Sequence, residues 1–256
     1  MIATIAGKEL KSLFASPLAW MVLTVTQLIA GFAFLKRLDD FLQIQPQLVQ
    51  LASPPGVTEL VAGPLFFVTA MMLLFAVPLL GMRSIAEERR NQTMVFLTSA
   101  PVSMTQIVLG KFVGLFSFAL LIVALVSAMP LTLSASTTLD YGHIGALAAG
   151  VLLMAAGLAA VSLYMSSLTT HPMGAAFGTY AALLLMVFMA EAAGDGLRAR
   201  GWKLPAALAQ VFSPMKNFEP FGKGVVDTYA IACSVLFVVF FLVLAVRRLD
   251  ARRLRG

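Results

Sequence analysis

The chain has 256 residues, of which 60% are apolar and only 12% are charged, with a net charge of +6. An average soluble domain has about 25% charged residues, so this composition excludes an ordinary soluble globule and a disordered chain. The single cysteine, Cys233, excludes an intramolecular disulfide and a cysteine-cluster metal site. In so apolar a chain the basic excess is typical of a cytoplasmic membrane face, and we expect no nucleic acid partner.

The N-terminal stretch 1–16 has the pattern of an amphipathic helix. Its apolar side chains share one helical stripe, and its charged residues Lys8, Glu9 and Lys11 lie off that stripe. Such a segment lies on the membrane surface with its apolar face buried. The alternative is a frayed N-terminus without structure. The Ser16-Pro17 step then turns the chain into the first apolar run.

Six apolar segments without a charged residue are long enough to cross a hydrocarbon layer, which takes about 20 residues in a helix. They span roughly 18–35, 61–82, 112–133, 144–168, 173–190 and 228–246. Their continuous apolar character argues against a β-barrel, whose strands alternate in polarity. The sequence therefore predicts an all-α polytopic membrane protein with six transmembrane helices, which form one domain over 1–256.

The distribution of charge predicts the orientation of these spans. One face carries 11 basic residues against 4 acidic ones, a net charge of +7, and the other carries 7 against 8, a net charge of −1. Because basic loops stay in the cytoplasm, we expect both termini on the cytoplasmic side. The protein is then a multi-pass protein of a bacterial inner (plasma) membrane.

The loop 83–111 on the basic face is the most informative stretch. A charge cluster of Glu87, Glu88, Arg89 and Arg90 is followed by Asn91-Gln92-Thr93 and an apolar run. This pattern suits docking into a groove of a partner protein, and equally a solvated loop with a helix resting on the membrane. We expect Ser103 to cap the helix that follows and Lys111 to extend its ammonium to the aqueous surface.

Two later segments suggest contacts between helices. Gly174 and Gly178 form a small-residue pair four positions apart, which predicts helix packing within the chain or contact with a second chain. The outer loop 191–227 contains aromatic and apolar residues at helical spacing within 211–226. That spacing predicts a helix at the outer interface or one packed on the bundle.

The sequence offers no groups for catalysis. Gly110-Lys111 is the nearest approach to a phosphate-binding loop, but Thr105 and Phe112 stand where glycine and a hydroxyl residue are needed. We therefore expect no enzymatic activity, and no cofactor or metal bound by this chain. The spans also lack the ionisable residues that ion-coupled carriers keep at membrane depth.

Four stretches together resemble the ABC-2 type permeases, most closely their gliding-motility-type branch. They are the opening 8–17, the loop 83–103, the start of the third span at 106–112, and the segment 212–227 before the last span. The second and third stretches are the specific ones. The chain departs from the family at Gln92, where a glycine usually precedes the threonine.

The resemblance implies an export-type permease subunit that pairs with a second copy or a paralogous permease in membrane lipid. Two ABC ATPase subunits dock from the cytoplasm and bind ATP and Mg²⁺ themselves, and a periplasmic or envelope partner is an expectation of the same kind. The coupling region of the family corresponds here to Glu87, Glu88, Arg89, Arg90, Gln92, Thr93, Phe96, Leu97 and Pro101, beside an elbow helix that carries Lys8, Glu9 and Lys11. A membrane scaffold and an ATP-independent channel or carrier are the alternatives.

Overall fold

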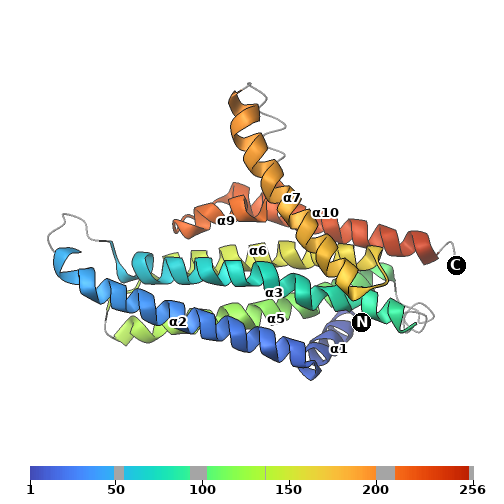
Figure 1. Ribbon diagram of the computed structural model, residues 1–256, viewed down its shortest axis with the longest axis horizontal. Helices are drawn as coiled ribbons and strands as arrows, with labels where there is room; N and C mark the ends of the chain where they lie inside the picture. The colour runs from blue at the N-terminus through green and yellow to red at the C-terminus, as the bar shows by residue number, and fades with distance from the viewer. Residues whose placement is uncertain (49–54, 93–102, 136, 200–210, 254–256) are drawn as a thin grey trace.

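A computed structural model shows a bundle of α-helices (Figure 1). It describes residues 1–48, 55–92, 103–135, 137–199 and 211–253. Within these ranges it contains no β-strand, and six helical stretches are long and apolar enough to cross a membrane. Helices satisfy every backbone polar group internally, as the hydrocarbon layer demands. The predicted fold class is therefore confirmed.

The described elements are all helical. In chain order they are α1 (Ile2–Ala15), α2 (Pro17–Leu48), the π-helix η1 (Thr58–Ala62), α3 (Gly63–Arg90), α5 (Met104–Leu131), the 3-10 helix η2 (Thr132–Ala135), α6 (Tyr141–Leu168), α7 (Pro172–Ala199), α9 (Pro214–Gly222) and α10 (Thr228–Arg253). Each of the six predicted apolar segments lies inside one observed stretch. The helices are longer than the segments because they continue into polar sequence at their ends.

Local sequence signals set several helix ends. Ser16 is extended between α1 and α2, and Pro17 begins the second helix because proline fits a first helical turn. Ser103 caps the start of α5, as predicted, and the structure adds a reciprocal hydrogen bond from the Ser103 N–H to the Gln106 side chain, which makes it a capping box. The side chain of Asp140 accepts a hydrogen bond from the backbone N–H of His143 and caps α6.

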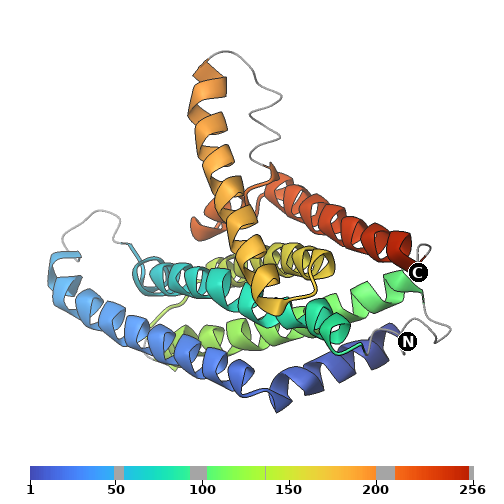
Figure 2. The same cartoon turned by 45° about the vertical axis from the view of Figure 1, so that its right-hand side comes forward.

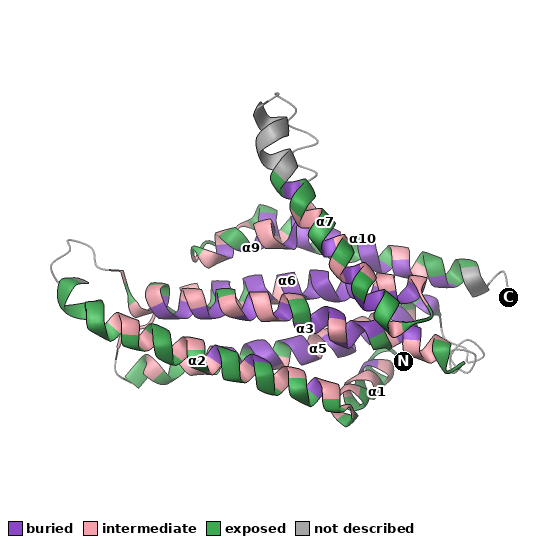
Figure 3. Ribbon diagram, viewed as in Figure 1, coloured by how far each residue is buried: buried purple, intermediate pink, exposed green. Residues whose placement is uncertain are grey.

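Helix α6 occupies the middle of the bundle (Figure 3). It contacts α3, α5, α7, α9 and α10, and 72% of its most apolar window is buried, against 17% for the peripheral α2. Its many alanines and glycines permit these close approaches. A Cβ atom at Gly150, for example, would lie 2.5 Å from Cβ of Phe221 in α9.

Helix α7 leans away from the bundle after its first turns, as two views show (Figures 1 and 2). Within the described residues it contacts α3 and α6. Large apolar side chains remain exposed along it, namely Phe177, Leu184, Leu185 and Phe188. The predicted outer segment 211–226 contains α9, which packs on α6 and α10.

Helix α1 lies on α5 at the end of the bundle where α1 begins and α10 ends (Figure 2). Two glycines of α5 make this contact possible. A Cβ atom added at Gly110 would lie only 2.6 Å from Cβ of Ile5, and one added at Gly114 only 2.7 Å from Cβ of Glu9. Residues four apart share a helix face. The two glycines therefore form a strip of α5 surface without side chains, the glycine track, on which α1 packs.

We expect Gly114→Ala to destabilise the protein, because the added methyl group overlaps Glu9 in a packed interface. Overpacking of this kind costs about 1–3 kcal/mol, which lowers the thermal unfolding midpoint measured in detergent. Gly145→Ala in α6 is the matched control, since a Cβ there meets nothing within 4 Å. A midpoint that moves equally in both variants would contradict the close packing of α1 on α5.

Candidate functional site

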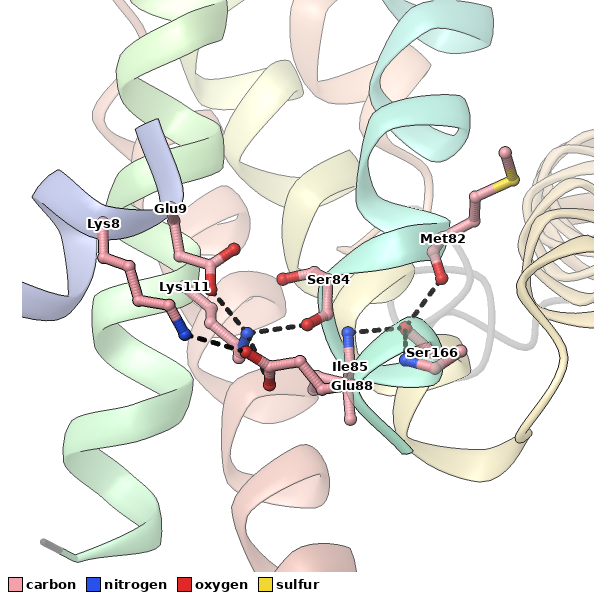
Figure 4. Close-up of polar contacts among 9 residues, drawn as sticks. Lys8, Glu9, Met82, Ser84, Ile85, Glu88, Lys111 and Ser166 are labelled. Carbon is pink, nitrogen blue, oxygen red and sulfur yellow. Dashed lines mark hydrogen bonds and ion pairs between the residues drawn. The ribbon is translucent and has the colours of Figure 1, made fainter. Parts of the chain in front are cut away.

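Lys111 is buried where α1, α3 and α5 meet, with 1% of its side chain exposed (Figure 4). The prediction that it reaches the aqueous surface was therefore wrong. Its Nζ lies 2.6 Å from Oε1 of Glu9 and 2.9 Å from Oε2 of Glu88, and it donates to the backbone carbonyl of Ser84 at 2.7 Å. Two of its donors are used in hydrogen bonds to Glu9 and Ser84, and Glu88 adds an ion pair.

The same network reaches the surface at Lys8. Its Nζ lies 3.4 Å from Oε1 of Glu88, and 63% of its side chain is exposed. We call Lys8, Glu9, Ser84, Glu88 and Lys111 the Lys111 cluster. It holds two lysines and two glutamates, so its ionised groups balance. A buried charge is tolerated only when it is paired and hydrogen-bonded, and here the pairing comes from three different helices.

Ser166 of α6 ties the end of α3 to the centre of the bundle. Its buried hydroxyl accepts hydrogen bonds from the backbone N–H groups of Ile85 (3.1 Å) and Ala86 (2.9 Å) and donates to the carbonyl of Met82 at 3.1 Å. The two helices touch closely here, because a Cβ atom at Gly81 would overlap Oγ of Ser162. The Ser166 hydroxyl thus bonds three backbone groups of α3 in the turn just before Glu87 (Figure 4).

Arg89 makes a second connection to α6. Its Nη1 donates to the carbonyl of Ser167 at 2.6 Å, with a longer contact of 3.5 Å to the carbonyl of Thr169. The last carbonyls of a helix lack partners within the helix and attract cations. Arg89 therefore caps the C-terminal end of α6 with its guanidinium.

The four charged residues predicted to dock a partner thus divide into two pairs. Glu88 and Arg89 are held by contacts inside the chain. Arg90 is exposed, and 46% of the Glu87 side chain is exposed, 3.9 Å from Arg83. We call Glu87, Arg90, Asn91 and Gln92 the outward face of α3. Thr93, Phe96, Leu97 and Pro101 lie outside the described residues.

Gln92 adopts a left-handed backbone conformation, with φ at 58°. Asn91 ends α3, and the N–H of Gln92 donates to the carbonyl of Arg89 at 3.2 Å. This is the position after a helix end that glycine commonly occupies. The departure from the resembled pattern at Gln92 therefore falls where the backbone itself favours glycine.

The remaining predicted site residues lie elsewhere. Lys11 is exposed on α1 and is not part of the Lys111 cluster. A Cβ atom added at Gly174 would lie 3.8 Å from Cγ2 of Thr169. A Cβ atom added at Gly178 would lie 3.7 Å from Sδ of Met165. These are ordinary contact distances, so packing within the chain does not require glycine at either position. Contact with a second chain stays a prediction.

Sequence reasoning missed the most closely packed glycine pair. Gly110 and Gly114 flank Lys111 at the same four-residue spacing as Gly174 and Gly178, and they carry the contact of α1 with α5. The spacing was a usable signal. It was masked by Lys111, which made the stretch resemble the end of an apolar span exposed to water.

Comparison with known protein families gives one match. Residues 3–201 match the family model described as ABC-2 family transporter protein. The matched region contains α1 to α7 and therefore the whole Lys111 cluster. No curated protein matches the chain.

Lys111→Met is expected to lower the free energy of unfolding by about 3 kcal/mol, because it leaves the largely buried Glu9 and Glu88 without the Lys111 ammonium, and only the exposed Lys8 stays near Glu88. Denaturant unfolding in detergent measures the loss. The triple variant Lys111→Met, Glu9→Gln, Glu88→Gln removes all three charges and should recover most of the stability. A triple variant as unstable as the single one would mean that charge pairing is not what the site needs.

Gln92→Gly is expected to stabilise the protein by about 1 kcal/mol, since glycine adopts the left-handed conformation without the steric penalty of a side chain. A higher thermal unfolding midpoint in detergent would show it. Gln92→Ala keeps the Cβ atom and serves as the control, with no gain expected. Equal gains in both variants would assign the effect to loss of the glutamine side chain instead.

Proposed function

We propose a function from one premise, that this chain belongs to the ABC-2 transporter family, whose model matches well over half of its length. A member of this family is a membrane permease component of an ABC transporter and has an ABC ATPase as its partner. We propose that this chain couples ATP hydrolysis on that partner to substrate movement across the inner membrane. ATP and Mg²⁺ then bind the ATPase, and this chain performs no catalysis.

The observation that carries the proposal is the way the end of α3 is held. Its outward face offers Glu87 and Arg90 to a partner, while its inner side is fixed by Glu88 to Lys111 and by Arg89 and Ser166 to α6. A force applied to the outward face therefore acts on α1, α3, α5 and α6 together. Packed helices respond to such a force by shifting as bodies between discrete arrangements.

The side of the membrane on which we place the site is inferred from charge. The end of the bundle with the Lys111 cluster also holds the start of α1 and the end of α10, where basic residues are concentrated. Basic segments beside membrane spans remain cytoplasmic. We place the outward face of α3 in the cytoplasm on this ground, within reach of an ATPase.

Three finer assignments belong to the same proposal and rest on the sequence resemblance. They are export as the direction of transport, membership of the gliding-motility-type branch, and pairing with a second or paralogous permease. The exposed apolar side chains of α7 offer a surface that either lipid or a second permease can cover. A periplasmic or envelope partner remains a proposal on the resemblance alone.

A charge swap on the outward face tests the docking proposal. Glu87→Arg with Arg90→Glu should reduce the ATPase that copurifies with the full chain by about tenfold, because misplaced like charges across an interface cost several kcal/mol. The net charge stays the same. Swapping Glu88 and Arg89 would be uninformative, because both hold the fold together.

The matched control is Arg37→Glu with Asp40→Arg, an exposed pair with its atoms 3.9 Å apart near the other end of α2. It should leave copurification unchanged, and both variants should keep the thermal unfolding midpoint of the parent protein. Undiminished copurification of the ATPase with the Glu87 and Arg90 variant would show that the partner docks elsewhere.

A further inference from the structure

A cavity of about 540 Å³ lies inside the bend between α1 and α2, with the end of α3 and the start of α5 as its other walls. Its size is within the range of about 300–1,000 Å³ typical of small-molecule sites. The Lys111 cluster forms part of its wall, and Ser12, Ser16 and Arg83 form another part. The outward face of α3 described above contributes Glu87 and Asn91.

Among the described residues, two cations in this cavity have N–H donors without a protein acceptor. Arg83 donates one hydrogen bond to Oγ of Ser16 at 3.2 Å and lies 3.9 Å from Glu87, and 45% of its side chain is exposed. Lys8 is 63% exposed and makes one 3.4 Å contact with Glu88. A guanidinium has five N–H donors and an ammonium three. Both groups therefore remain able to bind an anion.

The balance of charge in the cavity favours a zwitterionic ligand over a purely anionic one. Its ionised groups are three basic residues, Lys8, Arg83 and Lys111, and three acidic ones, Glu9, Glu87 and Glu88. Because they balance, a ligand with one negative and one positive group keeps the site neutral, and a ligand with only negative charge does not. Glu87 is the most exposed of the three carboxylates, at 46%, and is the one open to a ligand cation.

The remaining walls are apolar and the site lies at a membrane surface. Leu13, Leu18, Leu80 and Leu115 line the cavity. Beside it the indole Nε1 of Trp20 donates to the carbonyl of Phe14 at 2.8 Å, while 54% of the residue stays exposed. Tryptophan concentrates at the level of lipid headgroups, and α1 has the amphipathic pattern of a helix that lies there.

We propose that this cavity binds the headgroup of a zwitterionic phospholipid. The phosphodiester lies between Lys8 and Arg83 and accepts hydrogen bonds from them and from the hydroxyl of Ser12 or Ser16. The primary ammonium of the headgroup donates to Glu87, and the glycerol and acyl chains extend over the leucines. The site requires no partner protein, but it shares Glu87 and Asn91 with the outward face of α3. Lipid binding by the purified chain, with no ATPase present, therefore tests it separately from docking.

Native mass spectrometry of the full chain, delipidated in detergent and titrated with phosphatidylethanolamine, tests the site. We expect Lys8→Gln with Arg83→Gln to weaken binding by about tenfold or more, since charge-assisted hydrogen bonds contribute about 1.5–3 kcal/mol each. The matched control is Lys11→Gln with Arg90→Gln, which removes the same charge from the same two helices outside the cavity. It should change binding less than twofold.

Two further measurements keep the test decisive. Glu87→Gln should abolish the preference for phosphatidylethanolamine over phosphatidylglycerol, because it removes the partner of the ammonium. Ser16→Ala, which leaves the backbone of the bend intact, should weaken binding by a few-fold even if the double variant does not fold. Equal binding of both lipids by the parent chain, or equal losses in the control and cavity variants, would overturn the proposal.

Discussion

The buried ammonium of Lys111 is the constraint on which the end of this bundle depends. A lone charge in this position would be too costly to keep, so the fold must bring two carboxylates and a backbone carbonyl to it. These partners come from α1 and α3, while the lysine itself is on α5. A shift of any one helix along its axis would leave part of the set unpaired. The ion network therefore fixes the register of three helices together with the close contact of α1 on Gly110 and Gly114.

Helix α6 completes this arrangement by different means. It uses a neutral hydroxyl, Ser166, and the unpaired carbonyls at its own C-terminal end to hold α3. Charged, neutral and backbone groups thus converge on two turns of α3, and the glycine track under α1 lets the helices come close enough to do so. In a chain of this permease family, a contact made at this end of α3 would act on several helices at once, since α1, α5 and α6 are all bonded to it.

The sequence predicted what depends on short segments. The six spans follow from apolar length, the N-cap at Ser103 from a serine just before an apolar run, and α1 from its apolar stripe. It did not predict that Lys111 is buried or that Glu88 and Arg89 turn inward, because their partners lie on other helices, from 23 to 102 positions away along the chain. A charge beside an apolar run looks the same in sequence whether it meets water or a carboxylate. In the stretch around Lys111, the sequence signal for a neighbouring helix was the pair Gly110 and Gly114, four positions apart.

The length of α2 has a consequence for the opposite side of the membrane. The helix runs without interruption from Pro17 to Leu48, but its uncharged part ends before Lys36. At about 1.5 Å per residue, the remainder from Lys36 to Leu48 adds roughly 20 Å of helix beyond the uncharged part, with Pro46 in its last turn. The start of this extension favours water over hydrocarbon, because it carries Lys36, Arg37, Asp39 and Asp40. A molecule that binds the protein on that side of the membrane would therefore meet a preformed helix there.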